Sequence, residues 1–250
     1  MTGVYAAFAS VYDRLMADVE YPAWAAFYRT LLLKRGITGG AVCECACGTG
    51  SLTLLLQKHY EMTGVDISGE MLAIAAGKAR RAGLSIPFVQ TDMRSFSLHR
   101  PADGVLCTCD GVNYLPNERE VARFFRAAHQ ALRPGGALIF DVSTPYKLKT
   151  ILGSHSVGED AEDVAYLWQN KFYMKDCRVE MRLSIFKREE GGRYARIVEE
   201  QTQYGYTWPV LQTLLSAEGF TDISLYGDRI LDAPKATERR FHIAATKKET

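Results

Sequence analysis

Short apolar runs alternate with helical patterns through the first 145 residues of this 250-residue chain. Apolar residues between the runs recur at helical spacing, and Ser68 and Asn117 are placed to begin two of these helices. Strands and helices that alternate in this way predict an α/β fold with a doubly wound, mostly parallel sheet. The predicted strands are residues 41–46, 60–66, 86–91, 104–109 and 136–142.

The pattern differs on both sides of this region. Residues 5–35 show the spacing of two helices, whereas the helical period disappears over residues 164–206. Within that range, residues 178–185 alternate polar and apolar positions, and Gly191-Gly192 makes a turn. This period of two predicts an antiparallel insertion with one apolar face. A last helix is expected after Thr207, a candidate N-cap. Two further strands, 220–226 and 241–246, are expected to close the chain.

Charge and cysteine content narrow the class of protein. Lys and Arg total 30 against 29 Asp and Glu, so no global charge attracts nucleic acid or an anionic membrane. The six cysteines include no C-x-x-C pair, and five lie in strand-like apolar runs, which favours buried, reduced thiols over a metal site. We see no signal-peptide pattern and no apolar run of membrane-spanning length. We therefore expect a cytoplasmic protein that uses no metal, does not act on DNA and does not associate with membranes.

The segment 42–50, Val-Cys-Glu-Cys-Ala-Cys-Gly-Thr-Gly, carries the strongest chemical signal. It reads as a buried strand, an acid, a glycine-rich turn and the start of a helix, and a second strand ends at Asp66. This arrangement suits a ligand with a ribose and a charged tail at the carboxyl edge of a parallel sheet. The acid at Glu44 and the lack of a third glycine favour S-adenosylmethionine (SAM) over NAD.

Four motifs in this order resemble the class I SAM-dependent methyltransferases. The resemblance spans residues 37–145 and returns at 207–247, and it implies a seven-stranded Rossmann-like sheet whose final strand is antiparallel. The motifs are acid-x-x-Cys-Gly-Thr-Gly at 44–50, Val-Asp-Ile-Ser at 65–68, Thr-Asp-Met-Arg at 91–94 and Leu-Arg-Pro-Gly-Gly at 132–136.

The resemblance also implies roles for individual residues. Glu44 would lie near the SAM ammonium, Asp66 would bind the ribose hydroxyls, and Asp92 would accept from the adenine amino group. Each has a simpler alternative: an acid in a buried strand needs a partner, Asp66 could only cap a helix, and Asp92 could be a turn residue. Ile67, Met71 and Cys109 could likewise be plain core. The implied cofactor-binding set is Tyr12, Glu44, Ala46, Gly48, Asp66, Ile67, Met71, Asp92, Met93 and Cys109.

The segment 10–16 and the insertion are similar to those of small-molecule members, including the sugar-amine N-methyltransferases. There, a tyrosine at the position of Tyr12 closes over the cofactor tail, although Tyr12 could equally be helix packing. We expect a single domain over 1–250, with an N-terminal helical lid at 1–36 and a SAM-binding half at 37–145. The β insertion at 155–206 would be a substrate lid or the surface of a homodimer.

Methyl transfer from a sulfonium is an in-line displacement that positioning and exclusion of water can accelerate. A neutral amine needs no base, whereas a hydroxyl acceptor would gain from one. The candidate bases are Asp110, Tyr114 and His155. The aromatic residues of the insertion could form an acceptor pocket or simply the insertion's own core: they are Tyr166, Trp168, Phe172, Tyr173, Tyr204 and Tyr206.

The segment after the fourth predicted strand narrows the acceptor. Residues 109–114 contain neither the Pro-Pro pair of amino-methylating nucleic acid enzymes nor a Pro-Cys nucleophile. We predict methylation of a small molecule, at nitrogen rather than oxygen. An RNA methyltransferase and a non-catalytic SAM-binding protein are the alternatives.

Overall fold

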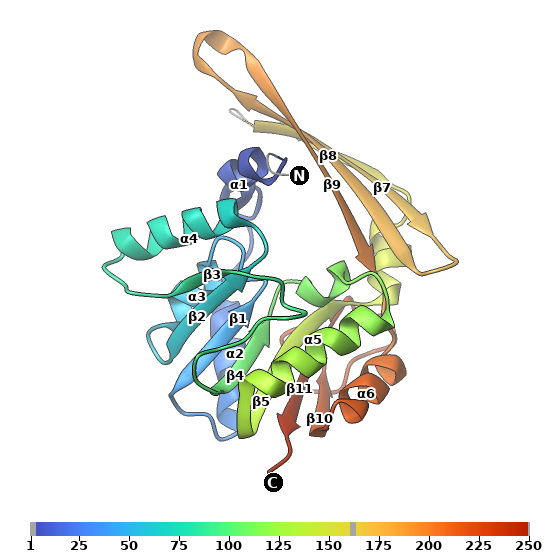
Figure 1. Cartoon of the computed structure of the whole chain (residues 1–250). Helices are drawn as coiled ribbons and strands as arrows, with labels where there is room; N and C mark the ends of the chain where they lie inside the picture. Colours follow the sequence, from blue (N-terminus) through green and yellow to red (C-terminus); the bar gives the residue numbers. More distant parts are fainter. Residues whose placement is uncertain (1–3, 161–163, 250) are drawn as a thin grey trace.

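The computed structural model describes residues 4–160 and 164–249, which form an α/β body and a separate antiparallel sheet (Figure 1). The body has a seven-stranded sheet in the order β10-β11-β5-β4-β1-β2-β3, in which β11 runs antiparallel to its neighbours β5 and β10. This confirms the predicted fold class, including the reversed final strand. The strands are β1 (Ala41–Cys45), β2 (Glu61–Asp66), β3 (Phe88–Gln90), β4 (Ala102–Cys107), β5 (Leu132–Ser143), β10 (Phe220–Tyr226) and β11 (Arg240–Lys247).

Helices cover both faces of this sheet because its central strands are apolar on both sides. On one face Phe124, Phe125 and Phe140 form the centre of a buried cluster, and on the other Tyr28, Leu31 and Leu106 do so. The helices are α1 (Val4–Leu15), α2 (Tyr21–Lys34), α3 (Ser51–Leu56), α4 (Gly69–Arg81), α5 (Glu118–Ala131) and α6 (Trp208–Ala217), with short turns η1 (Gly111–Tyr114), η2 (Lys147–Leu152) and η3 (Glu190–Gly192). No helix in the described ranges is long and apolar enough to cross a membrane.

Local capping matches the sequence at two of three predicted helix starts. The Ser68 hydroxyl accepts from the Met71 amide, and the Asn117 side chain accepts from the Glu120 amide. Thr207 stands at the N-cap of α6, but its side chain accepts no capping hydrogen bond. The fourth strand begins and ends two residues earlier than predicted, at Ala102 and Cys107, so Cys109 lies in a left-handed turn rather than in a strand (φ 54°).

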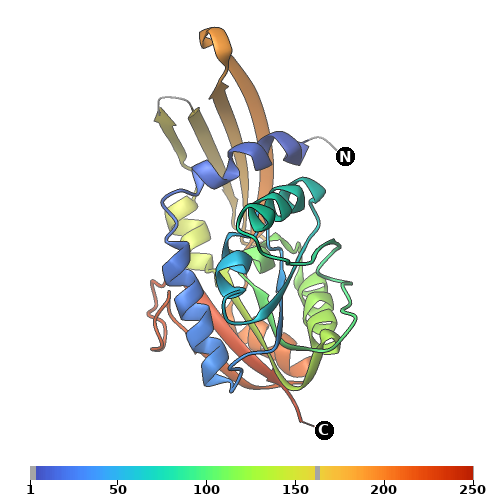
Figure 2. The ribbon, with the colours of Figure 1, turned by 90° about the vertical axis from the view of Figure 1, so that its left-hand side faces the viewer.

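The predicted insertion is a four-stranded sheet in the order β6-β7-β8-β9. Its alternating positions Val179, Met181, Leu183 and Ile185 are buried, which confirms the period of two. Helix α1 lies between this sheet and α4 (Figure 2), and Ala9 and Val11 pack against residues of both. The strands are β6 (Ser156–Asp160), β7 (Val164–Tyr173), β8 (Arg178–Arg188) and β9 (Tyr194–Tyr204).

Candidate active site

A cavity of about 530 Å³ opens at the carboxyl ends of β1, β2 and β4. Strand β9 of the inserted sheet, helix α1 and turn η1 complete its wall. Asp110 and His155 are not among the lining residues. The predicted residues that line it are Tyr12, Glu44, Ala46, Gly48, Asp66, Ile67, Met71, Asp92, Met93, Cys109 and Tyr114.

Asp66 holds the glycine-rich turn. Its Oδ2 accepts from the Gly48 amide at 2.8 Å, and its Oδ1 accepts from the Ser68 amide at 2.9 Å. Gly48 has a positive φ of 54°, and a Cβ placed there would meet no atom within 4 Å, so the backbone is open toward a ligand. Burial raises the pKa of Asp66, although the backbone amides that it accepts from oppose this shift. The carboxylate thus joins β2 to the turn after β1 and still faces the cavity.

Glu44 is 1% exposed at the base of the cavity. The hydroxyls of Thr53 and Thr108 both donate to its carboxylate, the second at 2.7 Å. Burial raises its pKa to about 7, against the two hydroxyl donors, which lower it. No ion pair joins Glu44 to a cationic side chain in the described part of the chain. A positive ligand group would therefore stabilise its ionised form.

Asp92 is hydrogen-bonded to Arg94, a residue for which the sequence predicted no role. Arg94 donates to both of its carboxylate oxygens, at 2.9 Å from Nε, and its Nη1 also donates to Glu120 at 2.6 Å. Hydrogen bonding to Arg94 lowers the pKa of Asp92. Any adenine group bound here would share the carboxylate with Arg94. The sequence feature that could have indicated this contact is the position of Arg94 in the Thr-Asp-Met-Arg motif.

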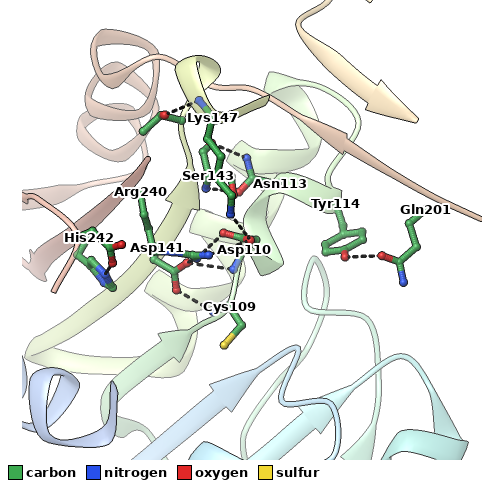
Figure 3. Close-up of polar contacts among 12 residues, drawn as sticks. Cys109, Asp110, Asn113, Tyr114, Asp141, Ser143, Lys147, Gln201, Arg240 and His242 are labelled. Carbon is green, nitrogen blue, oxygen red and sulfur yellow. Dashed lines mark hydrogen bonds and ion pairs between the residues drawn. The ribbon is translucent and has the colours of Figure 1, made fainter. Parts of the chain in front are cut away.

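The opposite end of the cavity is formed by the turn after β4. Asp110 faces away from the cavity toward Arg240 and Lys147 (Figure 3). Burial alone would raise its pKa, but the two cations outweigh this and lower it to about 2. Asp110 is therefore a poor general base at neutral pH. Tyr114 does line the cavity, and its hydroxyl donates to Gln201 Oε1 of β9 at 2.8 Å.

Helix α1 is tied directly to the glycine-rich turn. The Thr49 hydroxyl donates to Asp13 at 2.6 Å, and Lys78 of α4 donates to the same carboxylate at 3.0 Å. Tyr12 and Tyr21 line the cavity from this side, and burial raises the pKa of both hydroxyls. Contacts between residues so distant in the chain leave no signal in sequence spacing.

Comparison with known proteins defines the class to which this fold and cavity belong. The family model for the methyltransferase domain matches residues 42–136. A Geobacillus protein named "Putative methyltransferase GWCH70_2453" is 34% identical over 97% of this chain and 99% of its own length. The chain belongs to the SAM-dependent methyltransferase family, and its cofactor is SAM.

Solved structures agree on the fold. A SAM-dependent methyltransferase from Clostridium acetobutylicum superposes with a TM-score of 0.89 at 29% identity, over 98% of this chain and 100% of the other. The sugar N-methyltransferase KedS8 from Streptoalloteichus shares the fold at 23% identity, with a TM-score of 0.79, over 100% of this chain and 94% of its own. The predicted resemblance is thereby confirmed.

The cavity suits the cofactor on its own geometry. The open backbone at Gly48 leaves room for a ligand, and Glu44 lacks the cation that an ammonium would supply. Ile67 is 63% exposed beside Asp66, which leaves an apolar surface for a nucleoside.

Proposed function

We propose that this protein methylates a small molecule, and that the acceptor atom is nitrogen. The observation that carries the proposal is that segments outside the SAM-binding half also wall the cavity. Helix α1, η1 and β9 all contribute lining residues, so the wall around the cofactor site is built from parts that a macromolecular substrate would have to displace. A cavity of about 530 Å³ falls in the range of small-ligand sites.

We assign each residue of the cofactor end to one part of SAM. Glu44 receives the ammonium, the Ala46–Gly48 backbone borders the methionine part, and Asp66 accepts from the ribose hydroxyls. The adenine end is assigned to Ile67, Met71, Asp92 and Met93. Charge-assisted hydrogen bonds of this kind are the strong ones in such sites.

The bound cofactor supplies an electrophilic methyl group on a sulfonium. The chain's contribution is to hold the acceptor in line with that methyl and to keep water out. We assign Tyr12 and Tyr21 to closing the cavity on the side of α1 and α2. We assign Tyr114 and Gln201 to orienting the acceptor.

The shortage of a suitable base supports nitrogen over oxygen. No histidine is among the described lining residues, and burial raises the pKa of the Cys109 thiol, so it stays protonated. Among the lining carboxylates, Glu44 and Asp66 are assigned to the cofactor, and Asp92 and Glu200 lie within ion-pair distance of Arg94 and Arg182. A neutral amine attacks without deprotonation, whereas a hydroxyl would need a base. The fold shared with KedS8, a sugar N-methyltransferase, agrees with an amine acceptor.

We further assign residues 1–36 and 155–206 to a lid over the SAM-binding half, and treat the insertion as a substrate lid rather than a dimer surface. Its apolar face is already covered by Ala9 and Val11 of the same chain. The aromatic residues Tyr166 and Trp168 pack in that same cluster and so belong to the insertion's own core. Tyr204 instead lines the cavity.

The first test is calorimetric titration with S-adenosylhomocysteine (SAH), using NAD as the control ligand. We expect micromolar binding of SAH alone. Methyl-labelled SAM is then incubated with matched pairs of metabolites that differ only in an amine or a hydroxyl at the same carbon. Labelling of the amine members supports the proposal, whereas labelling of only the hydroxyl members, or of added RNA, would refute it.

A further inference from the structure

Two consecutive residues after β4 adopt a conformation that costs free energy. Cys109 and Asp110 have φ values of 54° and 65°, although neither is glycine. Left-handed backbone at non-glycine residues costs about 1–3 kcal/mol each and persists only where surrounding contacts enforce it. The turn borders the cavity, because Cys109 and Gly111 are both lining residues.

The contacts that enforce this turn come from one buried carboxylate on β5. Asp141 is fully buried, and its Oδ1 and Oδ2 accept from the amides of Cys109 at 2.8 Å and Asp110 at 3.0 Å (Figure 3). The Tyr28 hydroxyl donates to Oδ1 as well, at 2.5 Å. The two consecutive backbone amides of the strained turn therefore both donate to the carboxylate of Asp141.

Arg240 neutralises this carboxylate. Its Nη1 donates to both Asp141 and Asp110, and its guanidinium lies 4.8 Å from the centre of the Trp24 ring. A buried carboxylate is costly unless it is paired and hydrogen-bonded, and Asp141 meets both conditions. Arg240 thus links the backbone amides and the side chain of the same turn.

The neighbouring amide side chain extends this cluster to the lid. Asn113 Nδ2 donates to the backbone carbonyls of Ser143 at 3.0 Å and Tyr204 at 2.9 Å, and its Oδ1 accepts from the Ser143 amide. Tyr204 ends β9, the strand that carries Gln201. The turn after β4, η1 with Tyr114 and the base of the lid strand therefore meet around the end of β5.

We propose that Asp141, acting with Arg240, is a positioning residue that holds the Cys109–Asp110 turn as the acceptor-side wall of the cavity. This role rests on the proposed function of the cavity. The wall is close to the glycine-rich turn, because a Cβ placed on Gly111 would lie 3.2 Å from the Cβ of Ala46. We call the two hydrogen bonds from the Cys109 and Asp110 amides to Asp141 the clamp. Loss of the clamp therefore alters the cofactor end as well as the acceptor end.

The test is Asp141→Asn, with Asp103→Asn as a matched control. Asp103 also accepts a backbone amide, from Ala41 at 2.9 Å, and pairs with an arginine, Arg133, at 2.6 Å. It is absent from the cavity lining. Asparagine offers only one acceptor oxygen, so D141N leaves one of the two turn amides without its partner.

We expect D141N to speed hydrogen–deuterium exchange in a peptide spanning residues 107–115 by about tenfold and to weaken SAH binding by about tenfold, each corresponding to about 1.4 kcal/mol. D103N should lower the melting temperature by about as much as D141N does. The exchange rate at residues 107–115 and the SAH affinity of D103N should stay within about twofold of the wild-type values. If D141N does not fold, Arg240→Lys replaces it, with the same direction and about a threefold effect. Unchanged exchange at 107–115, or equal loss of SAH binding in D103N, would overturn the proposal. If the wild type fails to bind SAH, the proposed function fails, while the exchange measurement still tests the clamp.

Discussion

The two ends of the cavity are built in opposite ways. The proposed cofactor end draws mainly on residues 44–71, a continuous run of strand, turn, helix, strand and helix start, to which Asp92 and Met93 are added. The proposed acceptor end draws on Cys109, Tyr114 and β9, and on Asp141 and Arg240 behind them. A local run keeps its geometry through backbone hydrogen bonds and turn chemistry, whereas the second arrangement exists only once distant segments have packed.

The carboxylates at the two ends also differ in their partners and in their pKa values. Glu44 has hydroxyl partners but no cationic partner among the residues that the structure describes, and burial raises its pKa to about 7. Asp110 is paired with Arg240 and Lys147, which lower its pKa to about 2 despite burial. The comparison teaches that a carboxylate prepared for a cationic ligand is left unpaired by the protein, whereas one that supports the wall is neutralised by it.

The largest effect is expected where the cofactor end depends on a single side chain. Asp66→Ala removes the acceptor for the Gly48 and Ser68 amides and the proposed ribose contact, so SAH affinity should fall about 100-fold. Calorimetry measures the change, with Asp103→Asn as the control. An unchanged affinity would sink the ribose assignment and with it the contrast between the two ends.

Glu44 should make cofactor binding depend on pH. Its folded pKa of about 7 exceeds the ordinary 4.5, so its contribution to stability is present below pH 4.5 and is lost as the pH rises through about 7. Binding of an ammonium favours the ionised form, so SAH affinity should rise as the pH rises through about 7, by about tenfold in all. In Glu44→Gln the rise should disappear. Calorimetry across pH values checks this, and a slope that survives in the variant would remove Glu44 from the ammonium site.

The contacts between α1, which we propose to be part of a lid, and the glycine-rich turn should control cofactor release. Asp13→Asn weakens the Thr49 and Lys78 contacts, and because the Asp13 side chain is 44% exposed, the effect should be at most about 1 kcal/mol. SAH dissociation, followed by stopped-flow fluorescence, should speed up about three- to fivefold. Glu61→Gln, which breaks an exposed pair with Arg100 away from the cavity, is the control. Equal rates in both variants would argue against a lid.

The smallest effect on the cofactor is expected for the side chain of Tyr114, at the acceptor end. Tyr114→Phe removes only the hydroxyl that donates to Gln201, so SAH affinity should stay within about twofold. The same calorimetric titration measures it, and the rate with any amine acceptor found in the screen should fall. A tenfold loss of SAH affinity would instead place Tyr114 in the cofactor end.

The sequence by itself determined the doubly wound, mostly parallel sheet, the antiparallel insertion and the cofactor. Glu44, Gly48 and Asp66 could be found because the turn that joins them is local, and its motif spacing is preserved whatever packs around it. Period-two burial at Val179 to Ile185 was readable for the same reason. These features depend on backbone chemistry over a few neighbouring residues.

Only the tertiary structure decided what each acid at the acceptor end can do. Asp110 reads as a candidate base until Arg240, 130 residues away, is brought against it. The sequence indicated no role for Asp141, because the backbone amides that donate to its carboxylate lie in the loop after another strand, β4. The pKa of a carboxylate is set by burial and by the charges around it, and both are properties of packing rather than of order along the chain.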